Sequence, residues 1–252
     1  MILGRRVIVT MPAYHAGRTV EKMAAAMPRD IVDEVIFVDD ASGDDGYEKA
    51  VKAGLTAFRN EKNLNYGGNV KRCLQLALDH GADIAVLLHP DCQYTPSLVP
   101  AMAAMLCGTP YDLCLASRTS GAGTVSAGMP FWRYLPNRVI TTYMSWCLGV
   151  RHTEYHTGYR AYSRRLLEEV PFHSFRNDFI FDNQTLIGAM ERGFRTCEVT
   201  CPTVYQDDSS SIPFGKSVRY GLQCLKISLP FLRKRLLGQV QPPRRWPEGD
   251  FA

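Results

Sequence analysis

Three side chains that can bind a metal ion or a diphosphate stand at alternate positions in one short segment. His89, Asp91 and Gln93 offer an imidazole, a carboxylate and an amide, and they follow the apolar run Ile84–Leu88. Such a run predicts a strand that is buried on both faces of a parallel sheet. In an extended segment alternate side chains point the same way, and open α/β sheets bind ligands at the carboxyl ends of their strands. We therefore expect a nucleotide and metal site at residues 89–93.

Two other predicted strands are also followed by short clusters that could contact a nucleotide. Pro12, Ala13 and Tyr14 form a predicted turn after a strand at 6–11, and Asp39 and Asp40 follow a strand at 35–38. A nucleotide needs a ring to stack on its base, a carboxylate acceptor and a cation for its diphosphate. Mg²⁺ and Mn²⁺ take oxygen ligands, often only one or two of them from protein. Read alone, the two aspartates also suit helix capping, and residues 89–93 also suit a polar turn.

The elements that would position these residues alternate along the chain. This alternation predicts an α/β fold with a mostly parallel central sheet flanked by helices. The residues 63–69 (NLNYGGN) are expected to be a loop before a helix at 70–80. The remaining strands are expected at 56–59, 113–117 and 196–200, and helices at 19–26, 44–53, 97–107, 137–148, 182–192 and from 218 onward.

Taken together, the motifs MPAY, VDDASGD, NLNYGGN and LLHPDCQY resemble the N-terminal half of a family 2 glycosyltransferase of the GT-A (Rossmann-like) fold. The later TGYR resembles the T-x-G-F-R stretch of polyprenyl- and dolichol-phosphate sugar transferases. The resemblance covers roughly residues 6–211. It implies a glycosyltransferase domain at 1–214, with a nucleotide-binding half at about 1–118 and an acceptor half at about 119–214, followed by a basic amphipathic helix and tail at 215–252.

On this resemblance the nucleoside is bound by residues of the clusters after the first two strands, with Gly68 of the third motif and Lys71 just after that motif nearby. Asp91 matches the second acidic position of the family's D-x-D signature, and Gln93 matches a polar ligand beside it. His89 departs from the signature because it stands where the first Asp is expected. Either His89 ligates the metal ion, or it bonds to the diphosphate. The residues implied for the nucleoside and its surroundings are Pro12, Ala13, Tyr14, Asp39, Gly68 and Lys71.

The acceptor side of the implied site has two candidates. Asp182 stands roughly where the family places an acidic residue, and it would act as a catalytic base for a hydroxyl acceptor. A lipid-phosphate acceptor is already anionic and needs no strong base, and Asp182 also suits the first turn of a helix. Arg160 and the loop Gln206–Ser211 would contact the diphosphate or the acceptor, and a structural ion pair is an equal alternative for Arg160.

The basic residues are concentrated near the C-terminus. Eight of the 29 Lys and Arg lie between Lys216 and Arg245, where there is no Asp or Glu. In the same region, Val218 and five leucines recur at helical spacing. This predicts a helix that packs on the domain, rests peripherally on an anionic membrane, or self-associates. Pro230 is expected to kink it.

The composition excludes several other classes. At 252 residues, 46% of them hydrophobic, the chain can bury a full core, and the rest of the chain is net acidic. Basic and aromatic residues do not interleave on a groove-binding element, which argues against a nucleic-acid partner. The N-terminus lacks a secretory apolar region, so we expect a cytoplasmic protein, peripheral at most on the inner face of a membrane. Eight scattered cysteines are expected to be reduced thiols.

The resemblance to family 2 glycosyltransferases implies an inverting glycosyltransferase that uses Mn²⁺ or Mg²⁺. It would move a sugar from a nucleotide-diphosphate sugar to a lipid phosphate or a glycan hydroxyl. A nucleotidyltransferase would need a glycine- and arginine-rich phosphate loop after the first strand, and Pro12–Gly17 is not one. The alternative of another class is a non-catalytic nucleotide-sugar-binding or scaffold protein of the same fold, suggested by His89.

Overall fold

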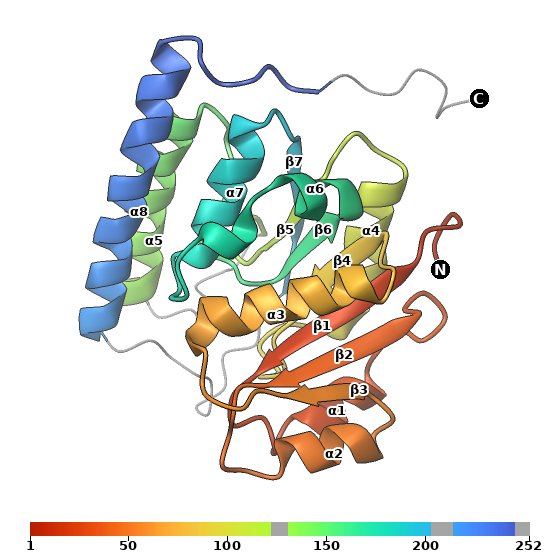
Figure 1. The fold of residues 1–252 in the computed structure, drawn as a ribbon. Coiled ribbons are helices and arrows are strands. Elements are labelled where there is room, and N and C mark those ends of the chain that lie inside the picture. Colours follow the sequence, from red (N-terminus) through yellow and green to blue (C-terminus); the bar gives the residue numbers. More distant parts are fainter. Residues whose placement is uncertain (122–130, 203–213, 245–252) are drawn as a thin grey trace.

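The structure, a computed structural model, describes residues 1–121, 131–202 and 214–244 (Figure 1). The predicted loop Gln206–Ser211 and the C-terminal residues 245–252 thus lie outside the described residues. A seven-stranded sheet runs through the molecule in the order β3-β2-β1-β4-β6-β5-β7. Its strands are β1 (Val7–Ala13), β2 (Glu34–Asp39), β3 (Thr56–Arg59), β4 (Ile84–Leu87), β5 (Leu113–Ser117), β6 (Arg160–Ser163) and β7 (Thr196–Thr200).

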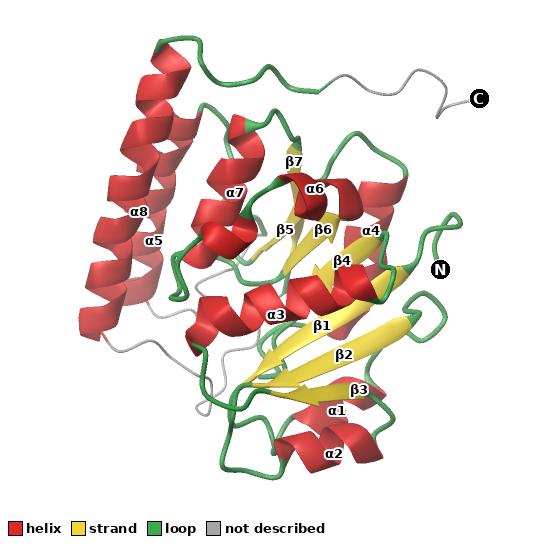
Figure 2. Ribbon diagram, viewed as in Figure 1, coloured by secondary structure: helices red, strands yellow, loops and turns green. Residues whose placement is uncertain are grey.

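Helices cover both faces of this sheet, as Figure 2 shows. The sheet is mostly parallel, so the predicted α/β fold is confirmed. The helices are α1 (Val20–Ala25), α2 (Gly46–Lys52), α3 (Asn65–Asp79), α4 (Val99–Cys107), α5 (Phe131–Leu148), α6 (Arg164–Glu169), α7 (Phe181–Glu191) and α8 (Phe214–Leu236), with 3₁₀ turns at Pro96–Leu98 and Phe172–Ser174.

The core consists of two hydrophobic layers, one on each face of the sheet. Strand β1 contributes to both, because Ile8 packs with one layer while Val7 and Val9 pack with the other. Helices α3 and α7 close the first layer, and α1 and α4 close the second. Because β1 is buried along its whole length, the residues at its carboxyl end are held on a rigid support.

Strand β6 was missed in the sequence. It pairs antiparallel with both β4 and β5, and so joins the part of the chain after α5 to the earlier strands in one sheet. Its four residues, RAYS, begin with Arg160, and so short a segment carries no periodic signal. Its burial comes from its neighbours in the sheet.

Two local predictions were wrong at element ends. Pro12 and Ala13 belong to β1, where they pair with Val38 and Asp39, and so do not form a turn. Helix α3 begins at Asn65, so part of the predicted loop is helical. Gly67 permits this: a Cβ there would lie 2.7 Å from the carbonyl oxygen of Arg176, so only glycine lets this helical turn approach that segment.

Helix α8 also differs from the prediction in the face that it buries. It packs against α5 and α7, but through Gly221, Cys224, Ser228 and Phe231. At Gly221 a Cβ would lie 2.9 Å from Ile140, so α5 and α8 approach closely. The helix is continuous through Pro230. Much of the leucine-rich stripe faces outward: the exposed members are Val218, Leu222, Leu229 and Leu236.

Candidate active site

The three predicted clusters lie at the carboxyl ends of adjacent parallel strands, β2, β1 and β4. Ala13 is in register with Asp39, and the Asp40 amide donates to the Ala13 carbonyl at 2.8 Å. On the other side of β1, the Leu88 amide donates to the Thr10 carbonyl at 2.9 Å, which sets the start of the loop after β4. The strand order therefore brings the clusters to one rim of the sheet, as expected from the sequence.

The loops of this rim carry unusual backbone conformations. His15, Ala41, Asn65 and Cys92 all have positive φ angles, between 57° and 62°. Residues other than glycine rarely adopt such angles, and they cluster at functional sites when the surrounding structure enforces them. His15, Ala41 and Cys92 lie in the loops after β1, β2 and β4, and Asn65 is the first residue of α3, which follows β3. The rim is thus the part of the chain where backbone strain concentrates.

Tyr14 and Asp39, both predicted to bind the nucleoside, differ in exposure. The Tyr14 side chain is 59% exposed, and the His15 ring lies beside it with the centroids 4.2 Å apart and the planes tilted by 59°. Asp39 is 1% exposed, accepts a hydrogen bond from Arg59 Nε at 3.0 Å and is bonded by Ser42. The amide and hydroxyl of Ser42 and the Arg59 guanidinium thus already meet both oxygens of Asp39, which fixes the orientation of this carboxylate.

The neighbouring Asp40 has a structural role that the sequence did not separate from that of Asp39. Its Oδ1 accepts from Asn60 at 2.6 Å and from the Leu64 amide at 2.8 Å. Asn69 then accepts from Asn60 and donates to the Val38 carbonyl. This buried amide network fastens the start of α3 to the end of β2. Of the NLNYGGN motif, Asn69 supplies a side chain to this network, and Asn60 lies just before the motif.

The segment after β4 is a turn, because the strand ends at Leu87. The argument that His89, Asp91 and Gln93 converge by alternation along an extended chain is therefore wrong. Asp91 is partly exposed, and its Oδ1 accepts from the Gln93 amide at 3.0 Å, which shapes the turn. All three residues still lie in one loop at the rim.

A chain of polar side chains links this loop to Asp182 at the start of α7. The Tyr66 hydroxyl donates to Asp182 Oδ2 at 2.6 Å and lies 3.3 Å from His89 Nε2. Burial, and then the charge of Asp182, raises the pKa of Tyr66 well above its ordinary value, so the hydroxyl stays protonated. Asp182 is 6% exposed, and its Oδ1 is buried without a hydrogen-bond partner among the described residues. Tyr66 was not predicted as a site residue.

Gly158 of the TGYR motif packs directly against His89 and Tyr66. A Cβ at Gly158 would lie 2.5 Å from His89 Nε2 and 3.1 Å from the Tyr66 hydroxyl oxygen. Because these contacts are shorter than side chains tolerate, this backbone position requires glycine beside the histidine. Phe179 stacks on the other side of Tyr66, with ring centroids 4.8 Å apart.

The two cations that the resemblance assigned to the site have protein partners. Arg160 is fully buried and donates to the carbonyls of Thr157, Tyr155 and Asp182, so it fastens the TGYR segment to the start of α7. Lys71 donates to the His173 carbonyl and to Asn177 Oδ1. Their roles in donor binding stay predictions.

Gly68, the remaining predicted site residue, is buried in α3. A Cβ there would lie 2.8 Å from the Cβ of Leu64, so the geometry gives this glycine a packing role. Beside the TGYR segment, Glu154 is fully buried and bonded by Arg118. Burial by itself would raise the pKa of Glu154, but the Arg118 guanidinium outweighs it and lowers that pKa.

Two buried histidines near this segment are held uncharged. Burial is the main cause that lowers the pKa of His152 and of His156 to about 4 each. His152 bonds to Thr196 Oγ1 at 2.7 Å, and His156 to the Tyr220 hydroxyl at 3.1 Å. His152 Nδ1 also lies 3.7 Å from Glu198 Oε2, but no group of three His, Cys, Asp or Glu in the described ranges has the arrangement of a metal site.

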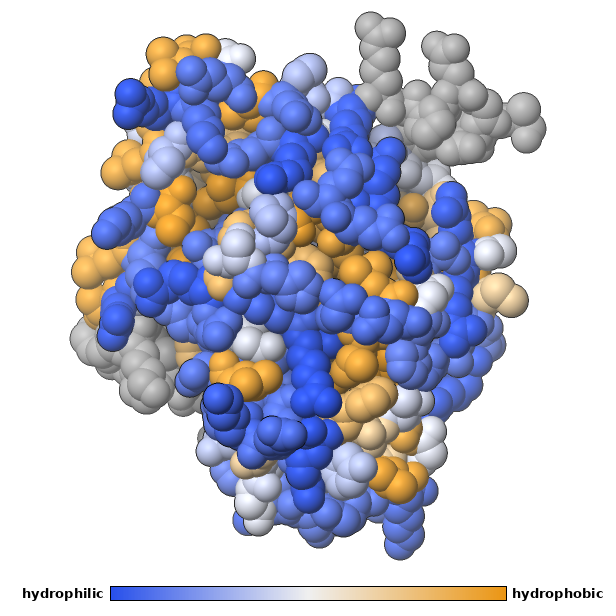
Figure 3. All heavy atoms as spheres, viewed as in Figure 1, coloured by the Kyte–Doolittle hydropathy of each residue, from blue (hydrophilic) through white to orange (hydrophobic). Residues whose placement is uncertain are grey.

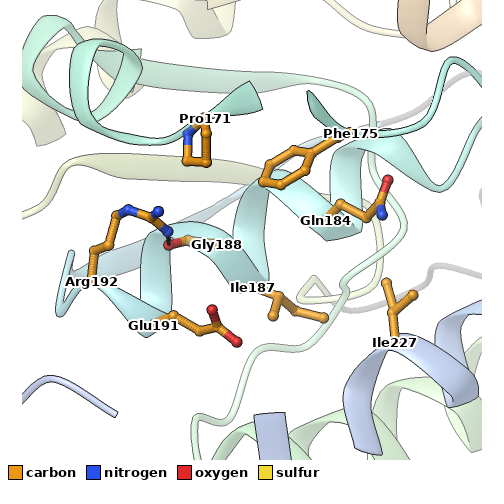
Figure 4. A pocket seen from close by; sticks show the side chains of 8 residues that line it. All are labelled: Pro171, Phe175, Gln184, Ile187, Gly188, Glu191, Arg192 and Ile227. Carbon is orange, nitrogen blue, oxygen red and sulfur yellow. Dashed lines mark hydrogen bonds between the residues drawn. The ribbon is translucent and has the colours of Figure 1, made fainter. Parts of the chain in front are cut away.

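A cavity on the flank of α7 is separate from the rim. It has a volume of about 250 Å³, and Figure 4 shows side chains of α7 and α8 around it. None of the predicted site residues lines it. The lining residues are Pro171, Phe175, Gln184, Ile187, Gly188, Glu191, Arg192 and Ile227.

Comparison with known proteins gives the family. Residues 8–171 match the sequence model of a family described as Glycosyl transferase family 2. The chain belongs to this family. It is therefore a glycosyltransferase, as the sequence predicted.

Curated relatives and solved structures agree with this assignment. The chain is 23% identical over 243 residues to the UDP-N-acetylglucosamine–dolichyl-phosphate N-acetylglucosaminyltransferase of Methanococcus voltae, covering 88% of this chain and 96% of that protein. It is 24% identical over 208 residues to glycosyltransferase AglD of Haloferax volcanii, covering 77% of this chain and 32% of that longer protein.

Among solved structures, glucosyl-3-phosphoglycerate synthase from Mycobacterium tuberculosis is similar in fold. Its complex with Mn²⁺, uridine diphosphate and phosphoglyceric acid has a TM-score of 0.70 and 20% identity, with 96% of this chain and 80% of that chain covered. That likeness confirms the predicted GT-A fold.

Proposed function

We propose that this chain transfers a sugar from a uridine-diphosphate sugar to a lipid-linked phosphate, with inversion at the anomeric carbon. The observation that carries the donor half is the gathering of Tyr14, Asp39 and the 89–93 loop at the ends of three adjacent strands. The exposed ring of Tyr14 could stack on the nucleotide base, and the Asp39 carboxylate could accept a hydrogen bond from the base or the ribose. The 89–93 loop could bind the diphosphate. Uridine is favoured because it is the nucleotide named for both the Methanococcus voltae relative and the solved complex.

The residues of the 89–93 loop fit a divalent cation shared with the diphosphate. Asp91 and Gln93 offer oxygen ligands and His89 a nitrogen ligand, a set that suits Mn²⁺ better than Mg²⁺. No three acidic, His or Cys side chains form a metal group in the described part of the chain. Such an ion would take its remaining ligands from phosphate oxygens and water, as these cations commonly do. It would supply charge neutralisation for the departing nucleoside diphosphate.

The acceptor half of the proposal rests on the outer surface of α5 and α8. Figure 1 shows these two helices side by side at one edge of the molecule. The outward stripe of α8 contains Leu222, 63% exposed, and Leu229, 52% exposed, with the exposed cations Lys226 and Arg233 between and beyond them. Figure 3 shows hydrophobic side chains interrupted by hydrophilic ones along this edge.

Helix α5 adds a second apolar stripe to the same layer. Leu135, Val139 and Trp146 are exposed at a spacing of four and seven residues. In the exposed positions of both stripes there is no Asp or Glu. Apolar side chains mixed with Lys and Arg are typical of helices that lie on anionic membranes. No described helix is long and apolar enough to cross a bilayer. We therefore propose peripheral contact with a membrane that holds the acceptor.

Asp182 belongs to the acceptor side of this proposal. Its buried Oδ1 has no partner among the described residues, and such an atom is costly unless a ligand or water meets it. A hydroxyl acceptor would give its proton to this carboxylate. A phosphate acceptor attacks as an anion and needs no base, so Asp182 would then act through the side chains that it holds.

The test is a calorimetric titration of the full chain with UDP-, GDP-, CDP- and dTDP-sugars, first with Mn²⁺ and then with EDTA. We expect one UDP-sugar to bind, and only with metal. Asp91→Ala should abolish this metal-dependent binding, whereas Asp79→Ala on the far end of α3 should leave it intact. Binding without release of nucleoside diphosphate in the presence of lipid phosphates and glycans would favour the scaffold alternative. No binding by any donor would refute the proposal.

A further inference from the structure

A hydrogen-bonded chain of three side chains joins α7, α3 and the loop after β4. Asp182 accepts from the Tyr66 hydroxyl at 2.6 Å, and that hydroxyl oxygen lies 3.3 Å from His89 Nε2. The Tyr66 and His89 rings are nearly stacked, with centroids 5.5 Å apart and an interplanar angle of 26°. The three residues are far apart in sequence, so this contact is a product of the fold.

The proton count along this chain fixes the roles of its members. A phenol has one proton, and an ionised carboxylate can only accept. Since the Tyr66 proton is given to Asp182, the Tyr66 oxygen can only accept from His89. The hydrogen on a neutral His89 must then be on Nε2, which leaves the lone pair on Nδ1.

The surroundings of His89 agree with this orientation. A Cβ on Gly158 would lie 2.5 Å from Nε2 and 3.0 Å from Cδ2, so this edge of the ring faces protein. Nδ1 is on the opposite edge, and it has no hydrogen-bond partner among the described residues. His89 itself is partly exposed. The Nδ1 lone pair is therefore on the edge of the imidazole that does not pack against Gly158.

We propose that Tyr66 is a positioning residue, which, held by Asp182, fixes His89 as the Nε2–H tautomer and presents Nδ1 as a ligand at the diphosphate and metal site. Histidine ligands are generally oriented in this way by a second group that accepts from the other ring nitrogen. Here the accepting group is a tyrosine oxygen with a carboxylate behind it. This inference rests on the proposed function only for the identity of the ligand at Nδ1, which would be the metal ion of the donor site. It gives Asp182 a role even when the acceptor needs no base.

The first measurement concerns the tautomer and needs neither metal nor donor. Imidazole ¹⁵N NMR of the metal-free full chain at pH 8 distinguishes the two neutral forms of His89. We expect a single Nε2–H tautomer in the wild type, and a mixture or the Nδ1–H form in Tyr66→Phe. Tyr94→Phe is the matched control, because the Tyr94 ring also neighbours His89, at 6.4 Å, but no hydrogen bond joins them. It should keep the wild-type tautomer.

The second measurement is Mn²⁺ affinity in the presence of UDP, followed by the electron paramagnetic resonance of the ion. Loss of a group that orients a ligand typically weakens metal binding 10- to 100-fold, so we expect at least a tenfold loss in Tyr66→Phe and none in Tyr94→Phe. An Nδ1–H tautomer in the wild type would overturn the inference, and this reading does not depend on any variant folding. A changed tautomer with unchanged Mn²⁺ affinity would overturn Nδ1 as a ligand. Failure of every UDP-sugar to bind would instead count against the proposed function.

Discussion

Replacing Gly158 by alanine tests whether the packing of the TGYR segment positions the site. The new Cβ would lie 2.5 Å from His89 Nε2, whereas ordinary contact begins at 3.4 Å. The imidazole must therefore move by about 1 Å, which lengthens its 3.3 Å contact with the Tyr66 hydroxyl. The strain of overpacking is typically about 1–3 kcal/mol.

These magnitudes separate an effect on the site from an effect on folding. For a domain of this size, about 1–3 kcal/mol lowers the melting temperature by roughly 2–12 °C, so the protein should remain folded at 25 °C. A misplacement of about 1 Å at a catalytic group can cost on the order of 100-fold in rate. We expect Gly158→Ala to weaken Mn²⁺-dependent UDP binding at least tenfold and to reduce turnover further.

The matched control is Gly108→Ala at the end of α4. A Cβ there would meet only the Ala104 carbonyl oxygen at 3.8 Å and Leu3 at 4.0 Å, and the φ angle of −107° suits alanine. Calorimetry and thermal unfolding of both variants give the comparison. If Gly158→Ala binds Mn²⁺ and UDP as tightly as Gly108→Ala does, the packing of Gly158 against His89 has no part in the site, and the reasoning is refuted.

Three other perturbations give distinct outcomes. Asp182→Asn should lower turnover at least 100-fold with donor affinity nearly intact if the carboxylate acts as a base; equal turnover measured with a lipid phosphate would exclude that role. Leu222→Gln with Leu229→Gln should weaken binding to vesicles of anionic lipid at least tenfold in a sedimentation assay, while Val51→Gln, an exposed valine on α2, should not; equal losses would refute a membrane role for α8. Acidification from pH 6.5 towards 4 should reduce the free energy of unfolding, because His152 and His156 have a pKa of about 4 in the folded protein and of 6.5 in the unfolded chain, which therefore binds more protons in this range. Denaturant titrations at each pH measure this effect, and a free energy of unfolding that stayed constant through the range would contradict it.

The sequence predicted those elements whose signal is local. The strands at 56–59, 113–117 and 196–200 have the predicted bounds, because each is an apolar or β-branched run between turn formers. The placing of three site clusters at one rim also followed, since parallel strands send their carboxyl ends to the same edge of the sheet. Strand β6 could not be predicted from the sequence, because its burial depends on β4 and β5 on either side of it.

The leucine pattern of α8 shows a different limit. Spacing identified an amphipathic helix, but it could not tell which face meets the domain. The buried face uses Gly221, Cys224 and Ser228, whose small side chains let α5 and α8 approach closely. Large apolar residues are then left outside. Leucine spacing alone therefore does not identify the face of a helix that packs on the domain, because that face is selected by how closely the two helices can approach.

The polar chain of the site was hidden for the same reason. Tyr66 reaches both Asp182 and His89 because two glycines remove side chains that would separate their backbones: Gly67 lets α3 approach the segment before α7, and Gly158 lets the TGYR turn approach His89. The sequence displays both glycines and all three polar residues, but the distances between them arise only when the two halves of the chain share one sheet. The departure of His89 from the D-x-D signature is thus matched by a tyrosine and a carboxylate that can fix its tautomer. A histidine held in this way would present one fixed lone pair to a metal ion, whereas the same histidine in an open turn would sample both tautomers.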